Sequence, residues 1–256
     1  MELNNIKIEK KGHVALAVIN HPPANTWNLA TSQDFERAID FLENDKDTRV
    51  IIITGSGDKC FSAGYDVSDA ANAHISSPLT RALWRRIDRM EKPTIAAMNG
   101  HAMGGGLELA LCCHFRIASD NPKIKFGLTE LNLGIIPGWG GTQRLSRIVG
   151  KAKALDMIMF SKVLSPQAAL EMGLVNQVAP ADQLLDVCLE FAGKLAARPP
   201  IAIKWVLKAM AAGDYEGIDA GLDTEADGGK AVRETKDREE GFKAFMEKRA
   251  PVFTGE

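Results

Sequence analysis

The sequence predicts an α/β fold, and three observations lead to this class. Short apolar segments such as VIIIT (50–54) and TIAAMN (94–99) have the length and composition of strands that are buried on both faces of a sheet. Segments with apolar residues at helical spacing lie between such strands. Glycine-rich loops follow the strands, and ligands in α/β folds bind outside the carboxyl ends of strands.

The first elements are a hairpin and a helix. Ile6 and Ile8 alternate with polar residues, and a turn then leads to VALAVI (14–19), so a β-hairpin is expected. Thr31 or Ser32 is expected to cap the first helix. Its core-facing side chains recur at helical spacing: Phe35, Ala38, Ile39 and Leu42. After the strand 50–54 and a loop at 55–66, Ser77-Pro78 is expected to open a second helix.

The middle of the chain continues the alternation. The strand 94–99 is followed by a predicted turn at 100–106 and a helix at 107–113. Two further strands are predicted at 115–119 (FRIAS) and 123–127 (KIKFG).

The last third is mainly helical. Ser165-Pro166 is expected to open a helix that Gly173 closes, and one short strand, LVNQVA (174–179), follows it. The remaining pattern is helical, at 181–197, 200–212 and 236–249. We therefore expect a core at 1–195 and a helical C-terminal region at 196–256 that serves oligomerisation.

Composition excludes several classes of protein. The 256 residues carry a net charge of -2, whereas a general nucleic-acid binder has a basic excess. The four cysteines form no CxxC pair, so neither a zinc site nor a redox dithiol is expected. The polar start is unlike a signal peptide, and no run of about 18 apolar residues occurs that would span a membrane. These features predict a soluble, cytoplasmic protein without a metal.

Three loops carry the candidate chemistry: FSAGYD (61–66), GHAMGGGLE (100–108) and FGLTELNLGIIPGWGG (126–141). In the second loop, three glycines precede a helix, so free backbone N–H groups and the helix dipole would suit an oxyanion or a phosphate. A tight packing turn explains these glycines equally well. A dinucleotide site is disfavoured, because no acidic residue follows at the required spacing of about 20 residues.

Glu108 and Glu130 are the candidate acid and base. Glu108 lies in the first turn of an apolar helix, where a carboxylate is costly unless it is paired, functional or favoured by the helix dipole. Glu130 lies between apolar segments, and its alternative interpretation is a solvated loop carboxylate. Two carboxylates in apolar surroundings can have pKa values that differ enough for one to act as acid and the other as base. A serine hydrolase is disfavoured because no GxSxG motif occurs.

Taken together, these loops resemble the crotonase (enoyl-CoA hydratase/isomerase) superfamily. The similarity covers nearly the whole chain, and its strongest parts are FSAGYD, NGHAMGGGLELALCCHFRIAS, FGLTELNLGIIPGWGGTQRL and EGFKAFMEKR. The resemblance implies a spiral of ββα units with a C-terminal trimerisation region. It also implies a CoA thioester substrate, an enoyl-CoA hydratase activity, and a homo-oligomer that is a trimer or a dimer of trimers, with no metal or redox cofactor.

The resemblance also assigns roles to residues. The backbone N–H groups of Tyr65 and Gly105 correspond to the oxyanion hole, and Glu108 and Glu130 to the hydratase carboxylates, with Glu130 supplying the α-proton. The positions that correspond to coenzyme A contacts are Ala24, Ala63, Asp66 and Val67, together with Phe245 and Lys248 from a neighbouring subunit.

One departure from the family concerns Tyr65, since small residues are common at that position. A phenol there is expected to reshape the acyl pocket together with Trp84. A cyclic dienoyl-CoA hydratase or an enoyl-CoA isomerase is therefore an alternative within the superfamily. A non-catalytic or RNA-binding member of the same fold is a more remote one, which the charge balance disfavours.

Overall fold

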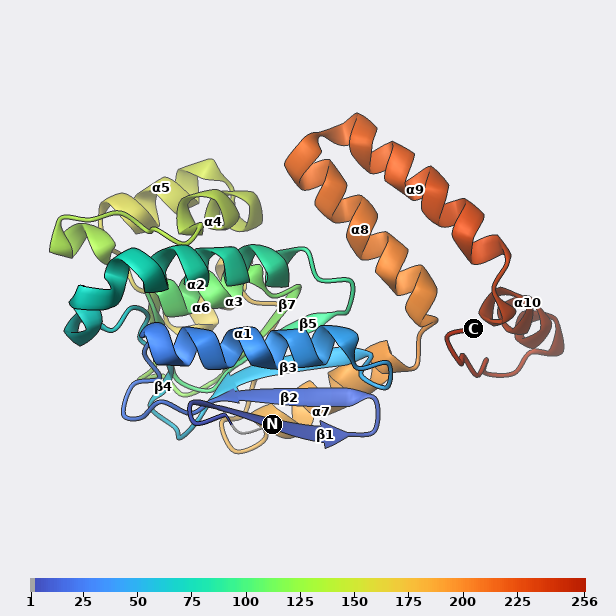
Figure 1. Ribbon diagram of the computed structural model, residues 1–256, viewed down its shortest axis with the longest axis horizontal. Coiled ribbons are helices and arrows are strands. Elements are labelled where there is room, and N and C mark those ends of the chain that lie inside the picture. The colour runs from blue at the N-terminus through green and yellow to red at the C-terminus, as the bar shows by residue number, and fades with distance from the viewer. Residues whose placement is uncertain (1–2) are drawn as a thin grey trace.

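The chain winds as a spiral in which successive turns add one strand to a large sheet and the next strand to a small sheet (Figure 1). This computed structural model describes residues 3–256. The hairpin β1–β2 is antiparallel, and the other strand pairs are parallel. The α/β class and the spiral of ββα units are thereby confirmed. The large sheet has the order β1 (Ile6–Lys11), β2 (Val14–Ile19), β3 (Val50–Gly55), β5 (Thr94–Met98), β7 (Phe115–Ser119) and β9 (Gln177–Ala179), and the small sheet β4 (Cys60–Ser62), β6 (His101–Met103) and β8 (Phe126–Gly127).

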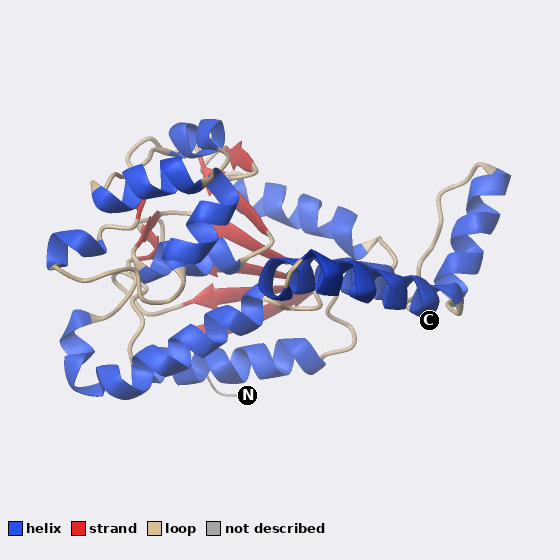
Figure 2. Ribbon diagram, turned by 90° about the horizontal axis from the view of Figure 1, so that it is seen from above, coloured by secondary structure: helices blue, strands red, loops and turns tan. Residues whose placement is uncertain are grey.

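Helices cover both faces of the large sheet and extend beyond it (Figure 2). In chain order they are α1 (Leu29–Asn44), the 3-10 helix η1 (Val67–Asn72), α2 (Ala73–Asp88), α3 (Gly105–Cys112), the 3-10 helix η2 (Glu130–Leu133), α4 (Gly141–Val149), α5 (Lys151–Met159), α6 (Pro166–Met172), α7 (Leu184–Ala196), α8 (Pro200–Glu216), α9 (Ile218–Arg233) and α10 (Lys236–Glu247).

The first four residues of β3 are all apolar because the strand is buried on both faces. Successive strand side chains point to opposite faces, so Ile51 and Ile53 join the core formed with α1, α2 and α3. Val50 and Ile52 lie on the other face, where α7 packs. Full burial of each such side chain contributes about 1.5–3 kcal/mol to stability. The prediction of a strand buried on both faces is confirmed.

Two predicted helix starts were wrong. Helix α1 begins at Leu29, and the side chain of Asn28 caps it by accepting from the N–H of Thr31. Thr31 therefore lies inside the first turn, where its N–H is one of the donors that need a cap. Helix α2 begins at Ala73 rather than at Ser77-Pro78, because η1 leads directly into it and supplies the turn before Pro78.

The loop strands are shorter than predicted. The segment KIKFG contributes only Phe126–Gly127 to a sheet. The predicted turn at 100–106 contains strand β6, and α3 begins within the glycine run, at Gly105. These short strands form the small sheet. Pairing with parallel neighbours stabilises them, although each has only two or three residues.

The C-terminal helices extend away from the sheet (Figures 1 and 2). The helices predicted at 181–197, 200–212 and 236–249 correspond to α7, α8 and α10, whereas α9 was not predicted. In residues 3–256, no helix has the length and hydropathy to cross a membrane. The proposed boundary after residue 195 falls at the end of α7 and stays a prediction.

Candidate active site

A cavity of about 300 Å³ lies where the loops after β4, β6 and β8 meet. It brings together Tyr65, Gly105, Glu108 and Glu130 from the three candidate loops. The rest of its wall is mainly apolar or small: Ala63, Val67, Ala73, Ser77, Met103, Gly104, Thr129, Leu133, Ile135, Ile136, Gly138 and Trp139. An apolar cavity with a few convergent polar groups is typical of a small-molecule site.

The backbone around Tyr65 and Gly105 presents two free donors. The bonds of Trp27 N–H to Gly64 O (2.8 Å) and of Asp66 N–H to Trp27 O (3.0 Å) flank Tyr65 on one side. Because strand N–H groups alternate in direction, the Tyr65 N–H points the other way. Gly105 is the first residue of α3 and has no intrahelical acceptor. Within residues 3–256, neither N–H donates a hydrogen bond to the protein.

Gly64 allows these two donors to lie close together. Its φ of 86° is in the left-handed region, and a Cβ there would lie 2.8 Å from the backbone N of Gly105 and from Met103 O. Any side chain at position 64 would therefore push the two loops apart. The arrangement has the geometry of an oxyanion hole, in which backbone donors oppose charge that develops on a carbonyl oxygen.

Glu108 is almost completely buried, with 2% of its surface exposed. Its Oε1 accepts from the backbone N–H groups of Trp139 (2.8 Å) and Gly141 (2.7 Å). Burial, together with the negative charge of Glu130, raises the pKa of Glu108 to about 7 against the effect of these two donors. A glutamate that only complemented the helix dipole would not need to be buried and hydrogen-bonded in this way.

Glu130 begins the 3-10 helix η2 and is 9% exposed. Its Oε2 is buried and, in the described part of the chain, has no hydrogen-bond partner. Burial raises the pKa of Glu130 as well. A Cβ on Gly104 would lie 3.3 Å from Glu130 Oε1, so the glycine run makes room for this carboxylate. The side chain is therefore not the solvated loop carboxylate of the alternative interpretation.

The two carboxylates line the same cavity. Burial raises the pKa of each, and the negative charge of Glu130 contributes to the raised pKa of Glu108. A carboxyl group with a raised pKa can donate a proton, and an ionised neighbour can accept one.

Aromatic side chains form part of the cavity wall. Trp139 makes edge-to-face contacts with Tyr65 (ring centroids 6.2 Å apart) and Trp84 (5.7 Å). Trp84 is fully buried behind Trp139 and does not line the cavity, contrary to its predicted role beside Tyr65. The sequence analysis assigned no role to Trp139, although a large aromatic residue between glycines was the available signal.

The residues predicted to bind coenzyme A fall into two groups. Ala63 and Val67 line the cavity, and Ala24 adjoins them because its O accepts from Ala63 N–H (2.9 Å). The Asp66 carboxylate accepts from the hydroxyl and backbone N–H of Ser68, which lowers its pKa. Phe245 lies on α10 and Lys248 just after it, and neither lines this cavity of their own chain. Helix α10 lies on the opposite side of the molecule from β4 (Figure 1).

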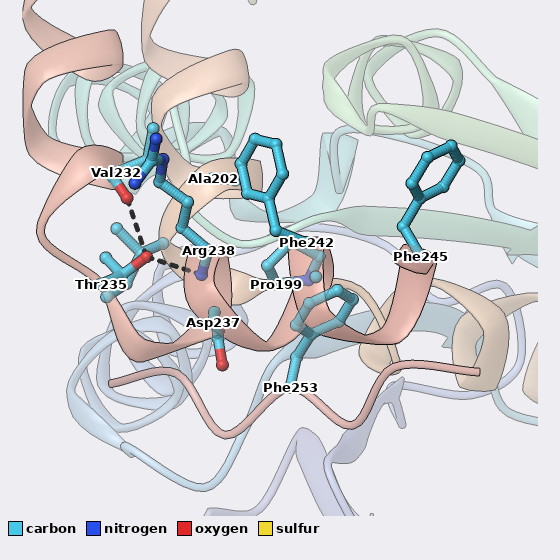
Figure 3. Close-up of a pocket in the computed structure, with 11 residues that line it drawn as sticks. Pro199, Ala202, Val232, Thr235, Asp237, Arg238, Phe242, Phe245 and Phe253 are labelled. Atoms are coloured by element: carbon cyan, nitrogen blue, oxygen red, sulfur yellow. Dashed lines mark hydrogen bonds between the residues drawn. The ribbon is translucent and has the colours of Figure 1, made fainter. Parts of the chain in front are cut away.

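A second cavity, of about 530 Å³, lies among α8, α9 and α10 (Figure 3). Phe242, Phe245 and Phe253 surround it, and its only carboxylate, Asp237, is engaged by the backbone N–H groups of Thr254 and Gly255. It is an apolar surface rather than a site of acid–base chemistry. Among residues 3–256, no group of three or more His, Cys, Asp or Glu side chains could hold a metal ion.

Comparison with known proteins agrees with this geometry. The family model for enoyl-CoA hydratase/isomerase matches residues 9–256. The short-chain-enoyl-CoA hydratase of Clostridium acetobutylicum is 40% identical over 97% of both chains, and the crotonyl-CoA hydratase of Syntrophomonas wolfei is 40% identical over 99% of both. The structure of an enoyl-CoA hydratase from Bacillus anthracis superposes with a TM-score of 0.94 at 37% identity, covering 99% of this chain and 100% of that one. The predicted family is confirmed, and these relatives carry the activity that the motifs implied. The chain belongs to the enoyl-CoA hydratase/isomerase family.

Proposed function

We propose that this protein is an enoyl-CoA hydratase that adds water reversibly to the double bond of a 2-enoyl-CoA thioester, giving a 3-hydroxyacyl-CoA. One observation carries the proposal. Two buried carboxylates, Glu108 and Glu130, share a cavity with the free backbone N–H groups of Tyr65 and Gly105. The hydratase names of the relatives support it.

The thioester carbonyl is bound by the two backbone donors. Conjugation with this carbonyl makes the β-carbon electrophilic, and attack there moves negative charge onto the carbonyl oxygen as an enolate forms. The N–H groups of Tyr65 and Gly105 oppose that charge, and one such donor contributes about 3–4 kcal/mol in comparable sites.

The two glutamates then carry out the two proton transfers of the reaction. Glu108, held in place by two N–H donors, accepts a proton from the water whose oxygen bonds to the β-carbon. Glu130 gives a proton to the α-carbon. The enolate electron pair forms the new C–H bond, so in each turnover one proton leaves Glu130 and one arrives at Glu108. No metal or redox cofactor takes part in these steps, and coenzyme A belongs to the substrate.

The coenzyme A portion is proposed to lie along the backbone near Ala24, Ala63, Asp66 and Val67, at the mouth of the cavity. Phe245 and Lys248 would contact it from a neighbouring subunit of a trimer or a dimer of trimers. Cytoplasmic action on free acyl-CoA esters is part of the same proposal.

The test is the variant Glu130→Gln, assayed by the loss of conjugated absorbance of crotonyl-CoA. Removal of an acid–base group should lower kcat by about 10²–10⁴-fold, because Gln cannot supply the α-proton. Glu171→Gln, at an exposed position on α6, is the matched control and should retain the wild-type rate. Full turnover by Glu130→Gln would contradict the mechanism.

A further inference from the structure

Trp139 is placed unusually for so large a residue. It follows Gly138 and precedes Gly140 in the loop before α4, and its backbone N–H donates to Glu108. Its side chain is 5% exposed, and the indole Nε1–H donates to the hydroxyl of Ser77 at 2.9 Å. Both ends of the residue are therefore fixed, the backbone by a catalytic carboxylate and the ring by α2.

The ring lies directly against the oxyanion loop. A Cβ built on Gly105 would be 2.2 Å from the ring carbon Cζ3 of Trp139, so the indole is in contact with the Gly105 backbone. Trp84 supports this arrangement, since its Nε1–H donates to Gly105 O (3.2 Å) and its ring packs on that of Trp139. An acyl group whose carbonyl is held at Gly105 must therefore meet the indole.

A larger space lies beyond the indole. A groove of about 1200 Å³ runs between α2 and α4, and Trp139 lines both this groove and the catalytic cavity. Pro78, Ala82 and Gly140 line the groove next to it, followed by arginines of α2 and α4. The catalytic cavity itself holds only about 300 Å³. The indole is thus part of the wall between the smaller catalytic cavity and the larger groove.

We propose that the side chain of Trp139 sets the acyl-length limit of this enzyme, so that it accepts short enoyl groups and excludes long ones. This inference rests on the proposed hydratase function and specifies its substrate class. Removal of the indole would join the catalytic cavity to the groove and give an acyl chain longer than crotonyl a space into which to extend. Each methylene that a pocket admits or rejects changes specificity by about 10–200-fold.

The test compares crotonyl-CoA with trans-2-decenoyl-CoA in the wild type and in Trp139→Ala. The wild type should prefer crotonyl-CoA, and the variant should raise the ratio of kcat/KM for decenoyl-CoA over crotonyl-CoA by at least about 10-fold. The Glu108 contact uses the backbone N–H of residue 139, so the substitution does not remove it. Trp139→Phe should give an intermediate ratio.

Phe160→Ala is the matched control, because Phe160 is 73% exposed at the end of α5 and does not line the cavity. Its chain-length ratio should equal that of the wild type. If Trp139→Ala fails to fold, Trp139→Phe and calorimetric binding of butyryl-CoA and decanoyl-CoA to it decide the question. A wild type that hydrates both esters equally, or folded variants with an unchanged ratio, would overturn the proposal. Absence of hydration of every enoyl-CoA by the wild type would instead refute the proposed function.

Discussion

Glu108 combines a buried carboxylate with two backbone donors, and this predicts how pH affects stability. Burial raises the pKa of Glu108 from 4.5 to about 7, so the folded protein binds the proton more tightly than the unfolded chain. The resulting stabilisation is fully present below pH 4.5 and is lost as the pH rises through about 7. At one pKa unit per 1.4 kcal/mol, the loss is about 3 kcal/mol at most.

The prediction is tested with Glu108→Gln, whose amide oxygen can still accept from Trp139 and Gly141. The melting temperature of the wild type relative to this variant should fall between pH 5 and pH 8, while other titrating groups are common to both proteins. If the melting temperatures of the two proteins changed in parallel across this range, burial of the ionised Glu108 carboxylate would carry no free-energy cost. Activity should be lost in the variant although its stability at pH 8 is higher.

The sequence motifs located the glutamates but not their surroundings. Glu108 and Glu130 were found because the glycine run and the FG segment place them next to recognisable loops. The role of Trp139 depends on contact with Gly105, which lies 34 positions earlier and is reached only through the tertiary fold. The tertiary fold also places Trp84 behind Trp139 rather than in the cavity wall, which the sequence alone did not indicate.

At the scale of elements, the start of α3 is the part of the fold on which the cavity depends. A Cβ on Gly106 would lie 2.1 Å from the backbone O of Ser62 in β4, so the two elements are in backbone contact. Gly106→Ala must push α3 away from the small sheet. We expect it to lower the melting temperature and to reduce kcat, since Gly105 moves with it.

Gly193→Ala is the matched control for this variant. Gly193 is exposed within α7, and a Cβ there meets no atom within 4 Å. Alanine is favoured over glycine in a helix interior by about 1 kcal/mol, so this variant should be as stable as the wild type or more stable. Equal melting temperatures for both variants would refute the claim of close packing at Gly106.

Predictability also differed among the elements. The buried strands and α6 were predictable because a continuous apolar run, or a proline at the start and a glycine at the end, determines them locally. Helix α9 was missed since its sequence IDAGLDTEADGGKAVR contains three glycines and few large apolar residues. Packing on α8 stabilises it instead, with Gly228 against the Trp205 side chain and Gly221 against Gly213.

At the scale of the whole molecule, the C-terminal helices expose apolar side chains of the kind that form interfaces between subunits. Met210 of α8 and Leu222 of α9 are 66% and 54% exposed. We expect a native mass of three or six times the 27.7 kDa chain in sedimentation equilibrium. Met210→Asp should shift the protein toward lower mass, whereas Phe41→Asp on α1 should not. A monomeric wild type would contradict this prediction.

The position of α10 leads to a sharper prediction about the assembled site. Phe245 is 81% exposed and does not line the cavity of its own chain, so its predicted contact with coenzyme A requires a neighbouring subunit. A chain with Glu130→Gln keeps an intact α10, and a chain with Phe245→Ala and Lys248→Ala keeps an intact Glu130. Each alone should be impaired.

When the two are refolded together at equal amounts, about one quarter of the sites in a cyclic trimer combine an intact Glu130 with an intact neighbouring α10. The turnover of crotonyl-CoA should then exceed the average of the two separate proteins. If α10 instead served its own chain, random mixing would create no complete site, and the activity would stay at that average.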